Sequence, residues 1–205
     1  MKVEVTGAEE ARARIAAVEA ALADKAALHR DIAHAARPVV SDWLLERDGK
    51  AKRKPGWPRS GYWGHAAESA AGESDAAAAW VTIRHKGVGL HLRGGTVKSA
   101  RPGGKLAIPL RAELAGVNPR EKFTDRADAF VLKSKGRGPE GRAFLAYREN
   151  GALRLAYLLL SSVTLREDPT VLPPSDRLAE AALKACAAYV RRAARRNPAA
   201  GRGPA

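Results

Sequence analysis

Two glycine-rich stretches share letters with nucleotide-binding motifs. In "SARPGGKL", Ser99 to Leu106, a Gly-Lys pair resembles the end of a phosphate-binding loop, which needs a glycine five residues before that pair and a hydroxyl after the lysine. Here Ser99 replaces the glycine and Leu106 replaces the hydroxyl residue. "GRGPEG", residues 136–141, has dinucleotide-site spacing, but strand-like "RAFLAYR" follows where that site needs a helix. We therefore expect neither a nucleotide nor another cofactor.

The histidines and acids give no better case for catalysis or metal binding. None of the five histidines pairs with another at metal-ligand spacing beside a carboxylate. His85 and His91 lie six residues apart, but residues 76–112 contain no Asp or Glu that would complete a site with them. Asp42 and Glu46 share a helix face, which is typical of a solvated surface. The sequence predicts no enzyme and no metal site.

The basic residues are the strongest chemical signal. The formal net charge is +14, which favours polyanions such as nucleic acid or an acidic protein surface. Residues 47–60, "RDGKAKRKPGWPRS", are broken by proline and glycine and predict a flexible basic arm. Its candidate polyanion contacts are Lys50, Lys52, Arg53 and Lys54. A second basic segment, residues 76–112, carries seven lysines and arginines, which a hairpin would gather at one edge: Arg84, Lys86, Arg93, Lys98, Arg101, Lys105 and Arg111.

Helical patterns lie at the two ends of the chain. Apolar residues at helical spacing predict one long helix from Gly7 to about Arg37, capped by Thr6 and ended or kinked by Pro38. "VVSDWLLERDG" adds one or two turns, closed by Gly49. "SGYWGHAAESAA" predicts a short helix, followed by a turn at "GESD". A last helix runs from about Ser175 to Arg196 with a buried stripe at Leu178, Ala182, Cys186 and Tyr189.

The middle of the chain has strand character. "AAWVTIRH" alternates, with Val81 and Ile83 on one face and Trp80, Thr82 and Arg84 on the other. "GGTVKSA" and "LAIPLR", joined by a turn at "RPGGK", predict a hairpin, in which Gly94 and Gly95 allow a sharp bend and Pro109 marks an edge or a strand end. "AFVLKS" and "RAFLAYR" predict a second hairpin. "ALRLAYLLLSSVTL" is the most apolar run and predicts the central strand.

These elements predict an α+β fold with a long N-terminal helix, a central, mostly antiparallel β-sheet built from hairpins, and a C-terminal helix packed on the sheet. The expected divisions are a helical segment over residues 1–48, a basic flexible linker over 49–59, an α+β core domain over 60–196 and a disordered tail over 197–205.

Three segments, taken in order, resemble a known family. "VGLHLRGGTVKS…GGKLAIPL" resembles the central signature of bacteriophage virion-morphogenesis proteins of the tail-completion and head–tail joining kind, with matching positions at His91, Gly94, Gly95, Thr96, Val97 and Pro109. "RSGYWGHAAES" is similar to the segment before that signature, and "AYLLLSSVTLREDPTVLP" to the strand-plus-proline ending of the family. The resemblance covers residues 57–195. Arg93 departs from it, since this position is often apolar or aromatic in the family.

The resemblance implies a structural protein without catalysis at the neck of a tailed phage or phage-like particle, assembled in the bacterial cytoplasm. Expected partners are further copies in a ring, other neck, tail and connector proteins, and non-specifically DNA; no membrane is involved. The candidate interface hairpin comprises His91, Arg93, Gly94, Gly95, Thr96, Lys98, Arg101 and Lys105. The alternative is a sequence-neutral nucleic-acid-binding protein that uses a basic surface.

Overall fold

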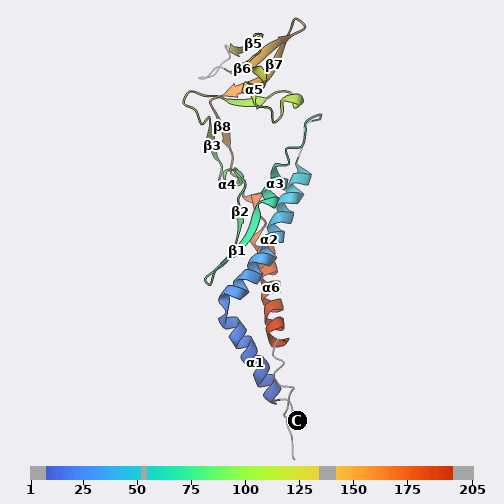
Figure 1. The fold of residues 1–205 in the computed structure, drawn as a ribbon, viewed down its shortest axis with the longest axis vertical. Coiled ribbons are helices and arrows are strands. Elements are labelled where there is room, and N and C mark those ends of the chain that lie inside the picture. The colour runs from blue at the N-terminus through green and yellow to red at the C-terminus, as the bar shows by residue number, and fades with distance from the viewer. Residues whose placement is uncertain (1–7, 52–54, 134–141, 196–205) are drawn as a thin grey trace, which may run out of the picture. The chain divides into compact units, whose positions relative to one another are not determined.

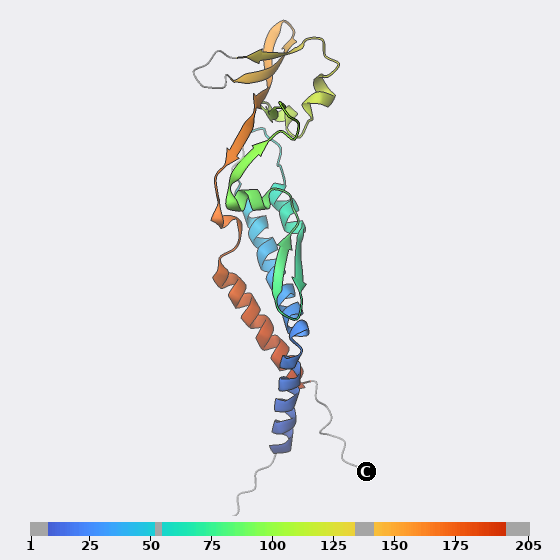
Figure 2. The same ribbon diagram turned by 90° about the vertical axis from the view of Figure 1, so that its left-hand side faces the viewer.

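A computed structural model describes residues 8–51, 55–133 and 142–195 (Figures 1 and 2). The chain forms two compact units. The helical unit comprises Met1–Lys50, Tyr62–Val88 and Thr170–Ala205, and the sheet unit comprises Ala51–Gly61 and Gly89–Pro169. The predicted α+β class is confirmed. The division differs from the predicted limits because both ends of the chain join one unit, which a linear sequence does not reveal.

The N-terminal helical region is two helices, α1 (Ala8–Ala23) and α2 (Lys25–Lys50), so the prediction of one helix from Gly7 to Arg37 is wrong. The break is at Asp24, whose carboxylate accepts a hydrogen bond from the Ala27 N–H at 3.1 Å and so caps α2. Pro38 does not end α2. Residues beyond the proline, Val40 and Leu44, are buried, and this burial offsets the hydrogen bond that proline cannot donate.

A two-stranded sheet packs on α2 in the helical unit. After α3 (Tyr62–Glu68), β1 (Ala70–Ser74) pairs antiparallel with β2 (Ala79–Ile83), so the turn predicted at "GESD" is mostly strand. Gly72 permits this packing, because a Cβ there would lie 2.5 Å from the Ala33 carbonyl oxygen of α2. The predicted faces of β2 are confirmed. Trp80, Thr82 and Arg84 all donate hydrogen bonds to the Glu73 carboxylate.

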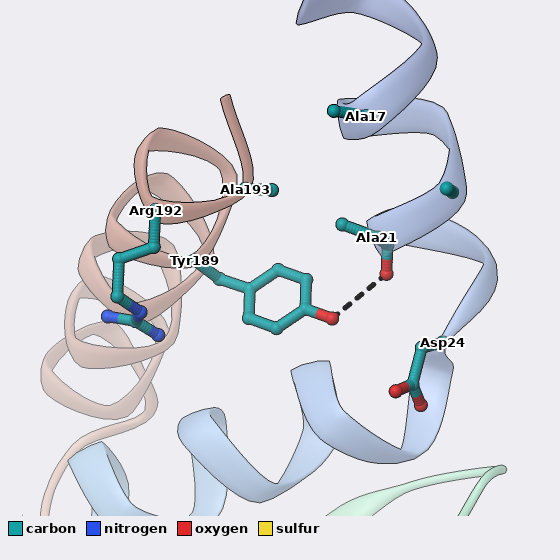
Figure 3. Close-up of a pocket in the computed structure, with 7 residues that line it drawn as sticks. Ala17, Ala21, Asp24, Tyr189, Arg192 and Ala193 are labelled. Atoms are coloured by element: carbon teal, nitrogen blue, oxygen red, sulfur yellow. Dashed lines mark hydrogen bonds between the residues drawn. The ribbon is translucent and has the colours of Figure 1, made fainter. Parts of the chain in front are cut away.

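The C-terminal helix α6 (Ser175–Arg195) follows the short turn η2 (Pro169–Val171) and packs along α1 and α2. The predicted helix is confirmed. Its predicted stripe is half-buried, and Tyr189 donates a hydrogen bond to the Ala21 carbonyl of α1 at 2.9 Å (Figure 3). Cys186 is half-buried within this stripe. Packing along α1 and α2 therefore joins the C-terminal helix to the N-terminal helices.

The first predicted hairpin of the sheet unit is wrong. After α4 (Val88–Arg93), β3 (Gly95–Lys98) pairs with β8 (Ser162–Leu165), while β4 (Leu106–Pro109) pairs with β7 (Ala152–Leu160). The turn between β3 and β4 forms as predicted, because the Gly104 N–H donates to the Arg101 carbonyl at 2.9 Å. The two strands that flank this turn belong to different sheets, which the local pattern cannot show.

A four-stranded antiparallel sheet has the order β4-β7-β6-β5, with β5 spanning Ala129–Lys133 and β6 spanning Ala143–Glu149. The predicted β5–β6 hairpin is confirmed, although its loop lies outside the described residues. The most apolar run does provide an interior strand, β7, but the run is interrupted at Ser161 and continues as β8 in the other sheet. Pro109 ends the edge strand β4, as predicted.

The core of the sheet unit lies on one face of this sheet, under η1 (Ala112–Leu114) and α5 (Pro119–Phe123). The Phe123 ring lies 5.5 Å from the Tyr147 ring and 6.0 Å from the Tyr157 ring, centroid to centroid. Buried Tyr157 donates a hydrogen bond to the Val117 carbonyl at 3.0 Å. Burial raises the pKa of the Tyr157 phenol. This cluster of Leu114, Phe123, Tyr147, Ala156 and Tyr157 covers one of the two faces of the sheet.

Candidate interaction surface

The opposite face of the four-stranded sheet is apolar and partly exposed to solvent. Residues paired across antiparallel strands share a face. One row across the strands consists of Phe130, Ala146 and Leu155. The next row consists of Leu132, Phe144, Leu158 and Ile108. With alternation along each strand, this apolar face comprises Leu106, Ile108, Leu110, Phe130, Leu132, Phe144, Ala146, Leu153, Leu155, Leu158 and Leu160.

Six side chains of the apolar face are at least 36% exposed: Ile108, Leu110, Phe130, Leu132, Leu153 and Leu155. The cause lies in the sequence of β7, "ALRLAYLLL". Most of its residues are apolar, both those that point to one face of the sheet and those that point to the other. Such a strand is typical of a sheet covered on both faces. Here η1 and α5 cover the Tyr157 side, whereas the leucines opposite remain in contact with solvent. Exposed apolar residues gathered on one face make this face a candidate interaction surface.

The net charge is concentrated in the same unit. The sheet unit contains 19 of the 36 lysines and arginines and 8 of the 22 acidic residues, which gives it +11 of the total +14. Lys105 precedes β4, Lys133 ends β5 and Arg142 precedes β6, and the strand registers place all three at one end of the sheet. All three are exposed, and no carboxylate in the described part of the chain forms an ion pair with them. We term this row the basic end.

Three arginines at the other end of the sheet have carboxylate partners. Arg154 pairs with Glu149 at 3.3 Å, and Arg126 pairs with Asp128 at 2.8 Å. The hydrogen bond from Arg126 lowers the pKa of the Asp128 carboxyl. Arg111, after β4, pairs with Glu113 at 2.7 Å. Arg148 of β6, at this same end and opposite Leu153 of the apolar face, is exposed and forms no ion pair within the described residues, so both ends of the sheet carry cations that face solvent.

The predicted interface residues do not form the predicted hairpin. His91 and Arg93 lie on α4, and Gly95, Thr96 and Lys98 lie on β3 beside β8, where Thr96 hydrogen-bonds Thr164 at 3.0 Å. Gly94 bends the chain with a φ of +69°, as its predicted role requires. Arg101 is in the turn, and Lys105 alone of the eight belongs to the basic end. Their role as an interface stays a prediction.

The gathered basic edge predicted for residues 76–112 does not form. Arg84 is in the helical unit and pairs with Glu73 at 2.7 Å, whereas Arg111 is in the sheet unit and donates to the Tyr147 hydroxyl at 2.7 Å. Of the predicted arm, Lys50 ends α2 and pairs with Glu46 at 3.3 Å, and Lys52, Arg53 and Lys54 lie outside the described residues. Sequence reasoning missed the apolar face, although leucines at both alternate sets of β7 positions were a readable signal.

Three cavities are lined by described residues of the helical unit. One, of about 390 Å³, is lined by apolar residues of α2, β2 and α6 that include Ile32, Val81 and Leu178. Another, of about 540 Å³, lies between α1 and α6 and is lined by alanines with Asp24, Tyr189 and Arg192 (Figure 3). The third, of about 650 Å³, is lined by residues of α2 and α6 that include Asp42, Glu46 and Glu180. None of the three has an evident catalytic arrangement. Within residues 8–51, 55–133 and 142–195, no three His, Cys, Asp or Glu residues converge on a metal position.

No helix in the described ranges has both the length and the apolar character needed to cross a membrane. Comparison of the chain with protein-family models, curated proteins and solved structures gives no match. The resemblance to virion-morphogenesis proteins therefore stays a prediction from the sequence.

Proposed function

We propose that this chain is a structural subunit of a multiprotein assembly and that it docks through the apolar face of its four-stranded sheet. The single observation that supports the proposal best is a sheet with a core cluster packed on one face and exposed leucines, isoleucine and phenylalanine on the other. A chain that works alone gains nothing from such a face, because exposed apolar area favours aggregation. A subunit that is covered on assembly gains affinity from it.

On the family resemblance, we propose that the assembly is the head–tail neck of a tailed phage or phage-like particle. The chain would act there in tail completion or head–tail joining, as a ring subunit beside other neck, tail and connector proteins. The proposal assigns it no catalytic step. Support comes from the order of the three matching segments and from an apolar face suited to a permanent contact.

The test is electron microscopy of particles produced after deletion of the gene, with complementation by wild type and by Leu153→Glu. The expected result is full heads separated from finished tails, rescued by wild type and not by the variant. Normal infectious particles from the deletion strain would exclude the neck function. Full rescue by Leu153→Glu would exclude docking through the apolar face.

Sequence-neutral nucleic-acid binding is the second candidate, and the concentration of positive charge in the sheet unit favours it. Duplex DNA binding would then weaken with salt with a log–log slope of about −0.9 for each phosphate neutralised. A salt titration of binding to mixed-sequence duplex DNA tests this, and an affinity that does not change with salt would reject it.

A further inference from the structure

We propose that α1 pairs with the α1 helix of a second copy of this chain in a short two-stranded coiled coil. The contact covers an apolar stripe on α1 that consists of Ala11, Ile15, Val18 and Leu22. We term these four residues the α1 stripe. The inference goes beyond the proposed function, because it concerns a surface of the helical unit and does not depend on docking through the four-stranded sheet.

The α1 stripe has the spacing of a coiled-coil seam. Its members are four, three and four residues apart, which is how the a and d positions of a heptad repeat alternate. Ile15 and Leu22 occupy a positions, and Ala11 and Val18 occupy d positions. All four are apolar, so two such stripes can pack against each other without burying a polar group.

The α1 stripe lies away from the side of α1 that packs on its own unit. Ile15 is 58% exposed and Leu22 is 45% exposed. The side that faces α6 consists of Ala17, Ala20 and Ala21, which line the cavity between the two helices (Figure 3). Because successive residues are rotated by about 100°, the centre of the α1 stripe lies about 140° around the helix from these alanines. α6 therefore leaves the α1 stripe available to another helix.

The charges beside the α1 stripe complement those of a second copy. Glu19 is exposed and forms no ion pair within the described residues. In a parallel pairing, position g of one helix faces position e of the other, so Arg14 lies opposite Glu19 of the second copy. In an antiparallel pairing that sets Ala11 opposite Leu22, Arg12 lies opposite Glu19 instead. Both arrangements give Glu19 a cation, and neither places like charges opposite each other.

The two arginines are available for this exchange. Within α1, Arg12 pairs with Glu9 and Arg14 pairs with Glu10, and all four side chains are more than half exposed. Exposed ion pairs of this kind contribute little to stability, so an arginine can share its carboxylate partner at small cost. The second copy therefore supplies Glu19 with the cation that its own helix does not.

The net charge favours a second copy over a nucleic acid or a membrane surface. Helices that bind phosphates or anionic lipids are rich in lysine and arginine. α1 instead carries three glutamates and two arginines, a net charge of −1. The helical unit as a whole carries only +3 of the total +14, so two copies meet at α1 with little repulsion.

The experiment measures the mass of the full, nucleic-acid-free chain by sedimentation equilibrium at protein concentrations of about 1 to 300 µM. The test variant is Ile15→Glu, which places a carboxylate in the seam. Two matched controls introduce the same residue elsewhere in the helical unit. Ala16→Glu changes an exposed position of α1 outside the α1 stripe, and Leu183→Glu changes a leucine of α6 that is 71% exposed. Circular dichroism checks that each variant keeps its helix content.

The expected dimer is weak. α1 has 16 residues, or about two heptads, so we expect a dissociation constant of about 10–100 µM. Ile15→Glu should weaken the dimer at least about tenfold, because its carboxylate loses water on association, while both controls should associate as wild type does. A wild-type chain that is monomeric up to about 300 µM would overturn the proposal. Equal losses in Ile15→Glu and Ala16→Glu would overturn it as well.

Charge reversal tests the flanks of the seam independently. Glu19→Arg should weaken the dimer several-fold, because position 19 faces an arginine in either orientation. Restoration by a second change, Arg14→Glu, would identify the parallel pairing, and restoration by Arg12→Glu would identify the antiparallel one. These effects should shrink as salt rises. Failure of both second changes to restore the dimer would overturn the proposal.

Two further results would each assign another occupant and overturn the proposal. Cosedimentation with phosphatidylcholine vesicles that Ile15→Glu abolishes would make the α1 stripe a membrane-binding surface. A dimer that Leu153→Glu abolishes and Ile15→Glu leaves intact would move the contact to the apolar face of the sheet. The particle experiment is separate from these results. Normal particles from the deletion strain would reject the neck function without changing the mass of the purified chain, and a monomeric chain would reject the α1 contact without rescuing the deletion.

Discussion

Replacement of Leu153 by glutamate is expected to separate docking from folding. Leu153 lies on the apolar face near the start of β7, is 51% exposed, and is opposite Arg148 of β6. A glutamate there keeps the strand and gains an oppositely charged cross-strand neighbour, which contributes roughly 0.2–1 kcal/mol. This gain offsets the lost packing, so we expect the free energy of unfolding to stay within about 1 kcal/mol of wild type.

The expected cost to docking is larger. The six most exposed side chains of the apolar face, at 36% to 51% each, expose together the equivalent of about two and a half complete side chains. Full burial of one such side chain stabilises by about 1.5–3 kcal/mol, so covering the apolar face contributes about 4–7 kcal/mol. Leu153→Glu removes its share and adds the desolvation of a carboxylate. We expect a loss of about 2–3 kcal/mol, or roughly 30- to 150-fold in affinity.

The assay pairs urea unfolding of the purified variant with quantification of its incorporation into particles. The matched control is Leu114→Ala, a core leucine with 2% exposure, which should destabilise the protein by about 2–5 kcal/mol. A large stability loss in Leu153→Glu would show that Leu153 belongs to the folded core. Normal stability together with normal incorporation would refute docking through the apolar face.

Three further outcomes test other parts of the structure. Hydrogen bonds from Arg84 and Trp80 hold the pKa of the Glu73 carboxyl below its usual 4.5. The ionised carboxylate therefore stabilises the fold above pH 4.5, and this stabilisation is lost as pH falls through the lower pKa of the folded state. Glu73→Gln should flatten the decline of Tm below about pH 4.5 in a thermal titration. Tyr157→Phe should cost about 1 kcal/mol in urea unfolding, because the Val117 carbonyl loses its donor, and an unchanged midpoint would contradict that hydrogen bond. Gly94→Ala should lower the free energy of unfolding more than Gly103→Ala. Both glycines have φ near +69°, but only at Gly94 would a Cβ contact backbone, 2.8 Å from the Glu167 nitrogen. Equal denaturation midpoints for the two variants would argue against that close contact.

Most individual elements followed from local patterns. The alternation of β2, the β5–β6 hairpin, the turn at Gly103 and the last helix all depend on residues that are near one another in the sequence. Helix period, strand alternation and glycine at positive φ are local properties, so the sequence predicts them directly. The sequence did not reveal the break between α1 and α2, because Asp24 within a helical pattern is equally compatible with a surface residue of one helix and with the cap of a second helix.

The candidate site depended on pairings that the sequence does not display. Val97 of β3 pairs with Val163 of β8, and Ile108 of β4 with Leu158 of β7, so a run predicted as one hairpin contributes to two sheets. The sequence by itself determined that residues 76–112 are basic without an acid and that residues 152–165 are the most apolar run. Only the tertiary structure decided which side η1 and α5 cover, since that depends on where Phe123 packs once the chain has folded back. The leucines left exposed on the other side are the surface that we propose a partner covers.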